Sequence, residues 1–251
     1  MVDELSSECG GGPKILSVVS GRMSTATRSI GSRRHVARVM QRLKSALGTM
    51  TEPAVEKIAE EEQSDPFKVL IATMLSAQTR DPVTLAASTR LFARAGTPEK
   101  MLRLRVSTIE RLIQPVSFYR NKAKHVRETC RLLLECYGGH VPATMPELLK
   151  LPGVGRKTAN LVLIVALRSQ SNICVDTHVH RISNRLGWVS TRTPEETELA
   201  LYEVASQRWW PLINQYLVTW GQNICKPRYP LCRRCAVEEL CPRLDVAQVG
   251  K

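Results

Sequence analysis

Four cysteines stand close together near the end of the chain, with spacers of six, two and five residues: Cys225, Cys232, Cys235 and Cys241. Where a cell keeps thiols reduced, such a group indicates metal binding and not disulfide bonding. Zinc sites commonly contain two Cys-x-x-Cys pairs, and only the middle spacer here has two residues. The pattern also differs from the spacers of two, two and three residues in bacterial ferredoxins. The residues alone therefore predict a metal site without naming its metal.

A lysine at an unusual place is the second candidate. Lys157 stands near the start of a predicted helix that continues into residues 161–167, an all-apolar run typical of a buried helix. The positive end of a helix dipole repels a cation, so a lysine is unexpected there. Either Lys157 turns out to solvent, or the site requires an amine. From spacing alone, a contact to a phosphate is favoured over a nucleophile.

Two glycines predict a tight turn just before this helix. The segment LPGVG (151–155) predicts a helix that ends near Lys150, a turn with Gly153 and Gly155, and a second helix from Arg156. The amides of such a turn and of the second helix's N-terminus point together and suit a phosphate. A nucleotide-binding P-loop is excluded, because its lysine directly follows a glycine and a strand precedes it; neither condition is met here.

Two more polar residues lie at predicted helix ends. Asp176 precedes the segment THVHR, where N-capping is the default role of an aspartate. Gln78, in the segment LSAQTRD, is by itself a polar residue at the end of an apolar helix. His178 and His180 are two residues apart on a helix and point to different faces, so no metal is assigned to them.

The elements that carry these residues are predicted to be helices. Apolar residues recur at intervals of three and four over 36–47, and an amphipathic helix over 122–137 stops at Gly138-Gly139. Asp65 is expected to be the N-cap of a helix with Pro66 at its first position, and Asp81-Pro82 is expected to begin a helix in the same way. No convincing run alternates as a strand would, so the fold class is all-α. The aromatic residues of Ser117-Phe-Tyr and Trp209-Trp210 are expected in the core.

The charge of the chain indicates its partner. The 251 residues contain 36 Lys and Arg against 23 Asp and Glu, a net charge of +13. A chain this basic usually binds a polyanion, most often nucleic acid; an acidic membrane surface and a merely solvated basic surface are the alternatives. No apolar run reaches the ~20 residues of a membrane span and no secretory signal is recognised, so we expect an intracellular protein. Residues 1–30 lack apolar periodicity and are predicted to form a disordered basic tail.

Four segments together resemble a known family. "LPGVGRKTAN" (151–160), followed by "VDTHVHRISNRL" (175–186), is similar to the helix–hairpin–helix DNA glycosylases, in particular to the endonuclease III group. "LSAQTRD" (75–81) resembles a third segment of that group, and the terminal cysteines resemble a fourth. The resemblance covers roughly residues 31–243, nearly everything outside the tail.

The resemblance implies a base-excision-repair DNA glycosylase with AP lyase activity on oxidised pyrimidines. Lys157 falls on the catalytic lysine of the bifunctional members, and Asp176 on their catalytic aspartate. Loss of a damaged base leaves positive character on the sugar C1′, which a carboxylate stabilises. An amine that attacks C1′ forms a Schiff base, and β-elimination then breaks the strand. The amine must be neutral to attack, a form that the helix N-terminus and apolar surroundings favour.

The resemblance also implies DNA contacts and a cofactor. Gln78 matches a glutamine that enters the duplex where the damaged nucleotide has left the stack. The four cysteines match the family's cluster loop, which implies a [4Fe–4S] cluster. Two sets of residues are then expected to meet the DNA backbone, the hairpin and the basic residues of the cluster loop. They are Gly153, Val154, Gly155 and Arg156, and Lys226, Arg228, Arg233 and Arg234.

The implied architecture has two helical lobes with a cleft for the flipped nucleotide. Residues 60–170 are expected to form a helical barrel with the hairpin, residues 31–59 and 171–244 the cluster lobe, and residues 245–251 a short tail. The expected partner is double-stranded DNA with a damaged base or an abasic site. No membrane association is expected, and the protein is predicted to be a monomer.

Three other functions are weighed. An adenine-mismatch glycosylase lacks the lysine and carries a further C-terminal domain, whereas Lys157 is present and about ten residues follow Cys241. A thymine-mismatch glycosylase is the closer rival, yet it also usually replaces that lysine. A non-catalytic, cluster-bearing DNA-binding or redox-sensing protein would use Lys157 as a phosphate contact. The joint presence of Lys157 and Asp176 disfavours that third reading.

Overall fold

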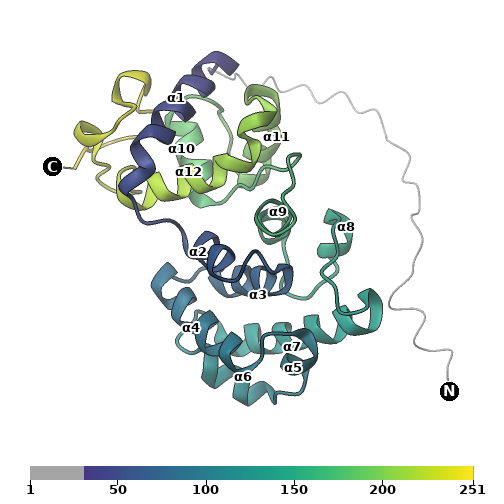
Figure 1. Ribbon diagram of the computed structural model, residues 1–251. Coiled ribbons are helices and arrows are strands. Elements are labelled where there is room, and N and C mark those ends of the chain that lie inside the picture. The colour runs from purple at the N-terminus through teal and green to yellow at the C-terminus, as the bar shows by residue number, and fades with distance from the viewer. Residues whose placement is uncertain (1–30, 251) are drawn as a thin grey trace, which may run out of the picture.

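The computed structural model describes residues 31–250, and these residues form helices and short 3₁₀ turns with no β-strand among them (Figure 1). The all-α prediction is confirmed. The predicted disordered tail, residues 1–30, lies outside the described residues. The α-helices are α1 (Arg33–Ala46), α2 (Ala54–Glu61), α3 (Pro66–Ser76), α4 (Asp81–Arg94), α5 (Pro98–Leu102), α6 (Val106–Ile113), α7 (Tyr119–Tyr137), α8 (Met145–Leu148), α9 (Arg156–Val165), α10 (Thr177–Arg185), α11 (Pro194–Val204) and α12 (Trp210–Asn223). The 3₁₀ turns are Leu47–Thr49, Gln207–Trp209, Cys232–Arg234 and Glu238–Leu240.

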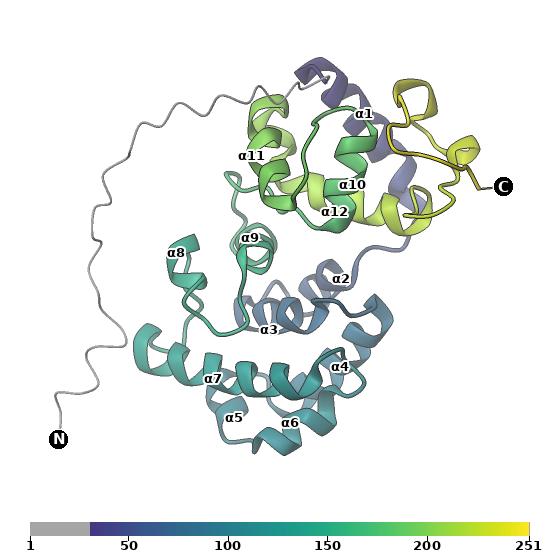
Figure 2. The same cartoon turned by 180° about the vertical axis from the view of Figure 1, so that it is seen from behind.

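The helices form two lobes, each around its own apolar core, with α9 between them in both views (Figures 1 and 2). The core of the larger lobe is built from α3 to α7 and α9 and includes Leu70 and Leu133. The core of the smaller lobe joins α1 to α10, α11 and α12 around Trp188, which is fully buried. A third, small cluster links α2, α3 and α9 to Cys174, just before α10. The two lobes are therefore packed together at α9.

The lobes divide the chain at a slightly different place from the expected one. Residues 54–59 were expected with the smaller lobe, but they belong to α2, which packs on α3 and α4, and Ile58 joins the larger core. No residue of α2 belongs to the core of the smaller lobe, to which α1 contributes Val36, Val39, Met40 and Leu43. At the other end, the expected tail folds back, since the Gly250 amide donates to the Pro230 carbonyl (2.9 Å).

A side chain caps the start of five of the twelve α-helices in residues 31–250. Asp65 accepts a hydrogen bond from the Lys68 amide (3.0 Å), with Pro66 at the first helical position, as predicted. Asp81 was expected to cap α4 in the same way, and this expectation is wrong, because Arg80 is the N-cap residue. The Asp81 carboxylate instead accepts from the first amide of α2, at Ala54 (3.1 Å), and from the Gln222 side chain of α12 (3.0 Å). Asp81 thus links the two lobes.

Within residues 31–250, every helix is too short or too polar to cross a membrane.

Candidate active site

A cleft of about 950 Å³ opens between the two lobes. It is lined by residues from α2, the loop between α3 and α4, the start of α9, the start of α10 and α12. Three residues singled out from the sequence line it together: Gln78, Lys157 and Asp176. The hairpin residues 153–156 lie outside the lining. The cleft therefore brings together the two side chains expected to be catalytic, and the hairpin lies next to Lys157 but outside the lining.

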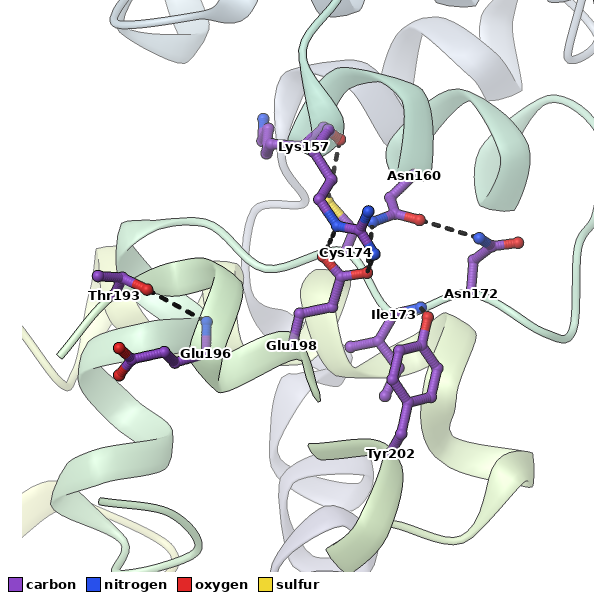
Figure 3. Close-up of polar contacts among 10 residues, drawn as sticks. Lys157, Asn160, Asn172, Ile173, Cys174, Thr193, Glu196, Glu198 and Tyr202 are labelled. Carbon is purple, nitrogen blue, oxygen red and sulfur yellow. Dashed lines mark hydrogen bonds and ion pairs between the residues drawn. The ribbon is translucent and has the colours of Figure 1, made fainter. Parts of the chain in front are cut away.

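Lys157 lies in the first turn of α9 and is half-buried. Figure 3 shows its side chain directed away from the polar contacts behind the helix, and no described residue forms a hydrogen bond or an ion pair with its Nζ. The backbone carbonyl of Lys157 accepts from the Cys174 thiol (3.5 Å). The helix is thus fixed through its backbone, while the amine stays available to the cleft.

Asp176 is the N-cap of α10, as its sequence position predicts. One carboxylate oxygen, Oδ1, accepts from the amides of His178 (2.8 Å) and Val179 (2.9 Å). The other oxygen has no donor among the described residues. N-capping therefore fixes the orientation of the carboxylate and leaves half of it for a ligand in the cleft, so the two expected roles are compatible.

Gln78 is exposed, and its backbone is left-handed with φ of 54°. The nearby Phe118, just before α7, also has a left-handed backbone with φ of 56°. Phe118 was expected in the core, and this is wrong, because its side chain is 65% exposed. The two loops are in contact, since the Ser117 amide donates to Thr79 Oγ1 (3.2 Å). Trp209, in contrast, is buried as expected.

The hairpin has the turn that its glycines predict. Gly153 is left-handed with φ of 77°, and a Cβ there would lie 2.8 Å from the His125 ring. A Cβ at Gly155, the N-cap of α9, would meet nothing within 4 Å. No side chain caps α9, so the first amides of the helix are left for an outside acceptor. The amide of Val154 is already bonded to the Leu151 carbonyl (3.1 Å), and the Val154 side chain is buried.

Arg156 forms a two-point ion pair with Glu198 of α11, at 2.8 and 2.9 Å. Glu198 is buried and also accepts from Asn160 (3.1 Å), which in turn accepts from Asn172 (2.9 Å), as Figure 3 shows. The hydrogen bonds to Glu198 raise the pKa of the Arg156 guanidinium above its ordinary value. The guanidinium is therefore committed to holding α9 against α11, and it is not directed at the cleft.

Two titratable groups in the cleft, Glu56 and His178, are given no role by the sequence alone. Burial raises the pKa of the Glu56 carboxyl, on α2, to about 7, and the positive charge of Lys157 opposes that rise. Burial lowers the pKa of His178, against the charge of Asp176. Nothing in the local sequence marks Glu56, because its importance comes from the approach of α2 to α9 across the cleft.

Cys225, Cys235 and Cys241 pack against the core of the smaller lobe, and Cys232 lies near these three cysteines. Burial is the main cause that raises the pKa of the Cys232, Cys235 and Cys241 thiols. The buried Arg185 donates to the Cys225 sulfur (3.5 Å) and to the carbonyl of Lys226 (2.7 Å).

Within residues 31–250, no three His, Cys, Asp or Glu side chains form a group that could hold a metal ion. A [4Fe–4S] cluster differs from a single ion in this respect, because each of its four irons takes one thiolate and the sulfurs need not converge on one point. Arg185 contacts two of the four thiols, because its guanidinium donates to Cys225 Sγ (3.5 Å) and its carbonyl accepts from the Cys241 thiol (3.5 Å). A set of four thiols spread over one loop is compatible with such a cluster.

Comparison with known proteins gives the family. The sequence model of the "HhH-GPD superfamily base excision DNA repair protein" matches residues 71–207. Endonuclease III of Thermotoga maritima is 50% identical over 179 residues, 71% of this chain and 84% of that protein. Endonuclease III-like protein 1 of Gallus gallus is 47% identical over 178 residues, 70% of this chain and 63% of that protein.

Solved structures give the same answer. A non-covalent endonuclease III–DNA complex has a TM-score of 0.75 with 31% identity, covering 84% of this chain and 96% of that one. A trapped covalent endonuclease III–DNA intermediate has a TM-score of 0.73, with the same identity and coverage. The chain belongs to the endonuclease III group of the HhH-GPD superfamily of base excision DNA repair proteins. The enzyme class expected from the sequence, a DNA glycosylase and lyase, is confirmed.

The ion pair behind α9 generates a prediction about stability. Arg156→Met should cost about 1–3 kcal/mol, because the buried Glu198 carboxylate then keeps Asn160 as its only donor. Glu198→Gln should cost less, since an acceptor remains and the Arg156 side chain, 46% exposed, can turn to water. Urea unfolding of the two variants at neutral pH measures the difference. An equal or reversed order would contradict this account of the pair.

The raised pKa of Glu56 generates a prediction about pH. The folded state holds this proton at a higher pH than the unfolded state, so the group's contribution to stability rises as the pH falls from about 8 to about 5. Glu56→Gln removes the cost of ionisation, and it should raise Tm clearly at about pH 8 and much less at about pH 5. Glu60→Gln, exposed on the same helix, is the matched control. A rise in Tm that is equal at both pH values would refute the assignment.

Proposed function

We propose that this chain is a bifunctional glycosylase and AP lyase that removes oxidised pyrimidines from double-stranded DNA, with Lys157 and Asp176 as its catalytic residues. The observation that carries the proposal is the cleft, which joins an unpaired amine from α9 to a half-occupied carboxylate at the start of α10. The two groups come from different lobes, so a nucleotide between them would meet both.

Asp176 acts first in the proposed reaction. As the bond between the sugar and the damaged base lengthens, C1′ gains positive charge and the base departs with the bonding electrons. A carboxylate already oriented by two backbone amides stabilises that charge without having to reorganise.

Lys157 then forms the covalent intermediate. Its amine gives an electron pair to C1′ and loses a proton to solvent, and the C1′–O4′ bond then breaks as O4′ takes up a proton, which leaves a protonated Schiff base between Nζ and C1′. The Schiff base acidifies the C2′ proton, and its removal expels the 3′ phosphate by β-elimination. Hydrolysis of the Schiff base returns the free Lys157 amine. The DNA strand is therefore cleaved without any net oxidation or reduction.

The surface around the cleft supports DNA binding. Gln78 is exposed beside the cleft and would enter the gap left by the flipped nucleotide, with the exposed Phe118 next to it. The uncapped start of α9, beginning at the open position of Gly155, would bind a phosphate through backbone amides. Arg156 would contribute its amide and not its guanidinium, which Glu198 holds.

We further propose that Cys225, Cys232, Cys235 and Cys241 hold a [4Fe–4S] cluster. The donor set supports this assignment, with three thiols packed on the smaller lobe, Cys232 near them and Arg185 beside Cys225. When bound, such a group supplies a rigid cross-link between the loop and the lobe, and it takes no part in the reaction. The basic residues of the loop would then meet phosphates. An intracellular location and a monomer complete the proposal.

Borohydride trapping tests the role of Lys157. The protein is incubated with a duplex that carries one thymine glycol, and borohydride is added to reduce the Schiff base to a stable protein–DNA bond. We expect a trapped complex with the natural chain and none with Lys157→Ala. Lys57→Ala, which removes another lysine from the lining of the same cleft, should trap normally. Base release without trapping would indicate a monofunctional glycosylase, and binding without either product would indicate a non-catalytic protein.

Metal analysis tests the cluster. Protein purified without oxygen should contain about four irons and four acid-labile sulfides per chain, and Cys235→Ser should lose them. Cys130→Ser is the control, because Cys130 is a buried free thiol in the larger lobe. Zinc in place of iron would overturn the assignment while leaving the proposed reaction untouched.

A further inference from the structure

A buried ammonium group lies directly behind the loop that carries Gln78. Lys122, on α7, is 8% exposed, and its Nζ has three acceptors. They are the carbonyl of Leu75 (2.7 Å), the carbonyl of Ala77 (2.6 Å) and Thr79 Oγ1 (3.2 Å). An ammonium group has three N–H donors, so all three are used. All three acceptors belong to one stretch of five residues, 75–79, with Gln78 inside it.

The charge of Lys122 suits this place. Leu75 is near the C-terminal end of α3, where carbonyls lack partners within the helix and the dipole is negative. Burial and the positive charge of Lys157 lower the pKa of Lys122 to about 8. At neutral pH the group therefore still carries most of its charge and its third proton. A neutral side chain of the same length could not satisfy three acceptors.

The backbone that Lys122 holds is strained. Gln78 has φ of 54°, in the left-handed region that residues other than glycine rarely adopt. Such a conformation persists only when the surroundings impose it, and Lys122 bonds to the residue on each side of Gln78. Thr79 Oγ1 also accepts from the Ser117 amide, next to the left-handed Phe118. The amine thus ties together the two loops that present exposed, left-handed residues.

We propose that Lys122 is a positioning residue for nucleotide flipping. Its ammonium fixes residues 77–79 so that Gln78, with Phe118 beside it, is held ready to enter the DNA stack. This inference rests on the proposed function of the cleft and of Gln78. A lysine with a merely structural role would instead stabilise the larger lobe without any selective effect on flipping.

The first measurement separates flipping from chemistry. A duplex carries an abasic-site analogue opposite a fixed base, with 2-aminopurine next to it, and the rise in fluorescence reports the opening of the stack. Lys122→Met should reduce that rise, and should slow single-turnover base release from duplex by on the order of tenfold to a hundredfold, as expected for a misplaced group. Lys124→Met, at an exposed position on the same helix, should change neither quantity.

The second measurement uses DNA that needs no flipping. On a single-stranded oligonucleotide with an abasic site, borohydride trapping by Lys122→Met should equal that of the natural chain, because Lys157 is intact. An equal loss of trapping on single-stranded and duplex DNA would overturn the proposal. If the natural chain itself gives no trapped complex on either DNA, the proposed lyase function is wrong. That result differs from a loss confined to the Lys122→Met variant, so the two proposals can fail separately.

A double-mutant cycle tests whether Lys122 acts through Gln78. In a Gln78→Ala background, Lys122→Met should give no further loss of 2-aminopurine fluorescence, whereas additive losses would contradict the proposal. If Lys122→Met does not fold, Thr79→Val serves in its place. It removes one acceptor of the ammonium and the link to Ser117 while keeping the side-chain shape, and it should reduce flipping in the same direction. Unchanged flipping in a folded Thr79→Val protein would overturn the proposal.

Discussion

The cleft depends on how firmly α9 is held against the smaller lobe, and the buried carboxylate of Glu198 supplies that hold. Its ion pair with Arg156 and its hydrogen bond from Asn160 join the first two turns of α9 to α11. Because these bonds form behind the helix, Lys157 is left to face the opposite side. Burial of the Glu198 carboxylate costs free energy, and its hydrogen bonds to Arg156 and Asn160 offset that cost. The same bonds fix the position of α9, and with it the larger lobe, relative to the smaller lobe.

The same principle recurs around the rim of the cleft. Asp81 holds the start of α2 and reaches Gln222 on α12, and Asp176 is fixed by the amides of α10. Each of these two aspartates accepts from at least one backbone amide, which cannot rotate away as a side chain can. The residues that meet DNA can therefore be held in conformations that would relax in an isolated loop. The two left-handed positions, Gln78 and Phe118, depend on such anchoring.

Sequence reasoning succeeded where the cause of a structure is local. Asp65 and Asp176 cap helices because a cap needs only the next three residues, and Gly138 ends α7 in the left-handed conformation that glycine permits. It failed where the cause lies far along the chain. Asp81 bonds to residues 27 and 141 positions away. Glu56 and Lys122 were not predicted for the same reason, because the residues around each of them come from distant parts of the chain.

The order of the lobes along the chain has a consequence for how the protein is made. The larger lobe is one continuous stretch, from α2 to α9, and can fold as soon as that stretch has been synthesised. The smaller lobe needs α1 from one end of that stretch and α10 to α12 from the other, so its core closes last. Since the cysteine loop follows α12 and lies on that core, a cofactor held there can be enclosed only after α12 and this loop have left the ribosome.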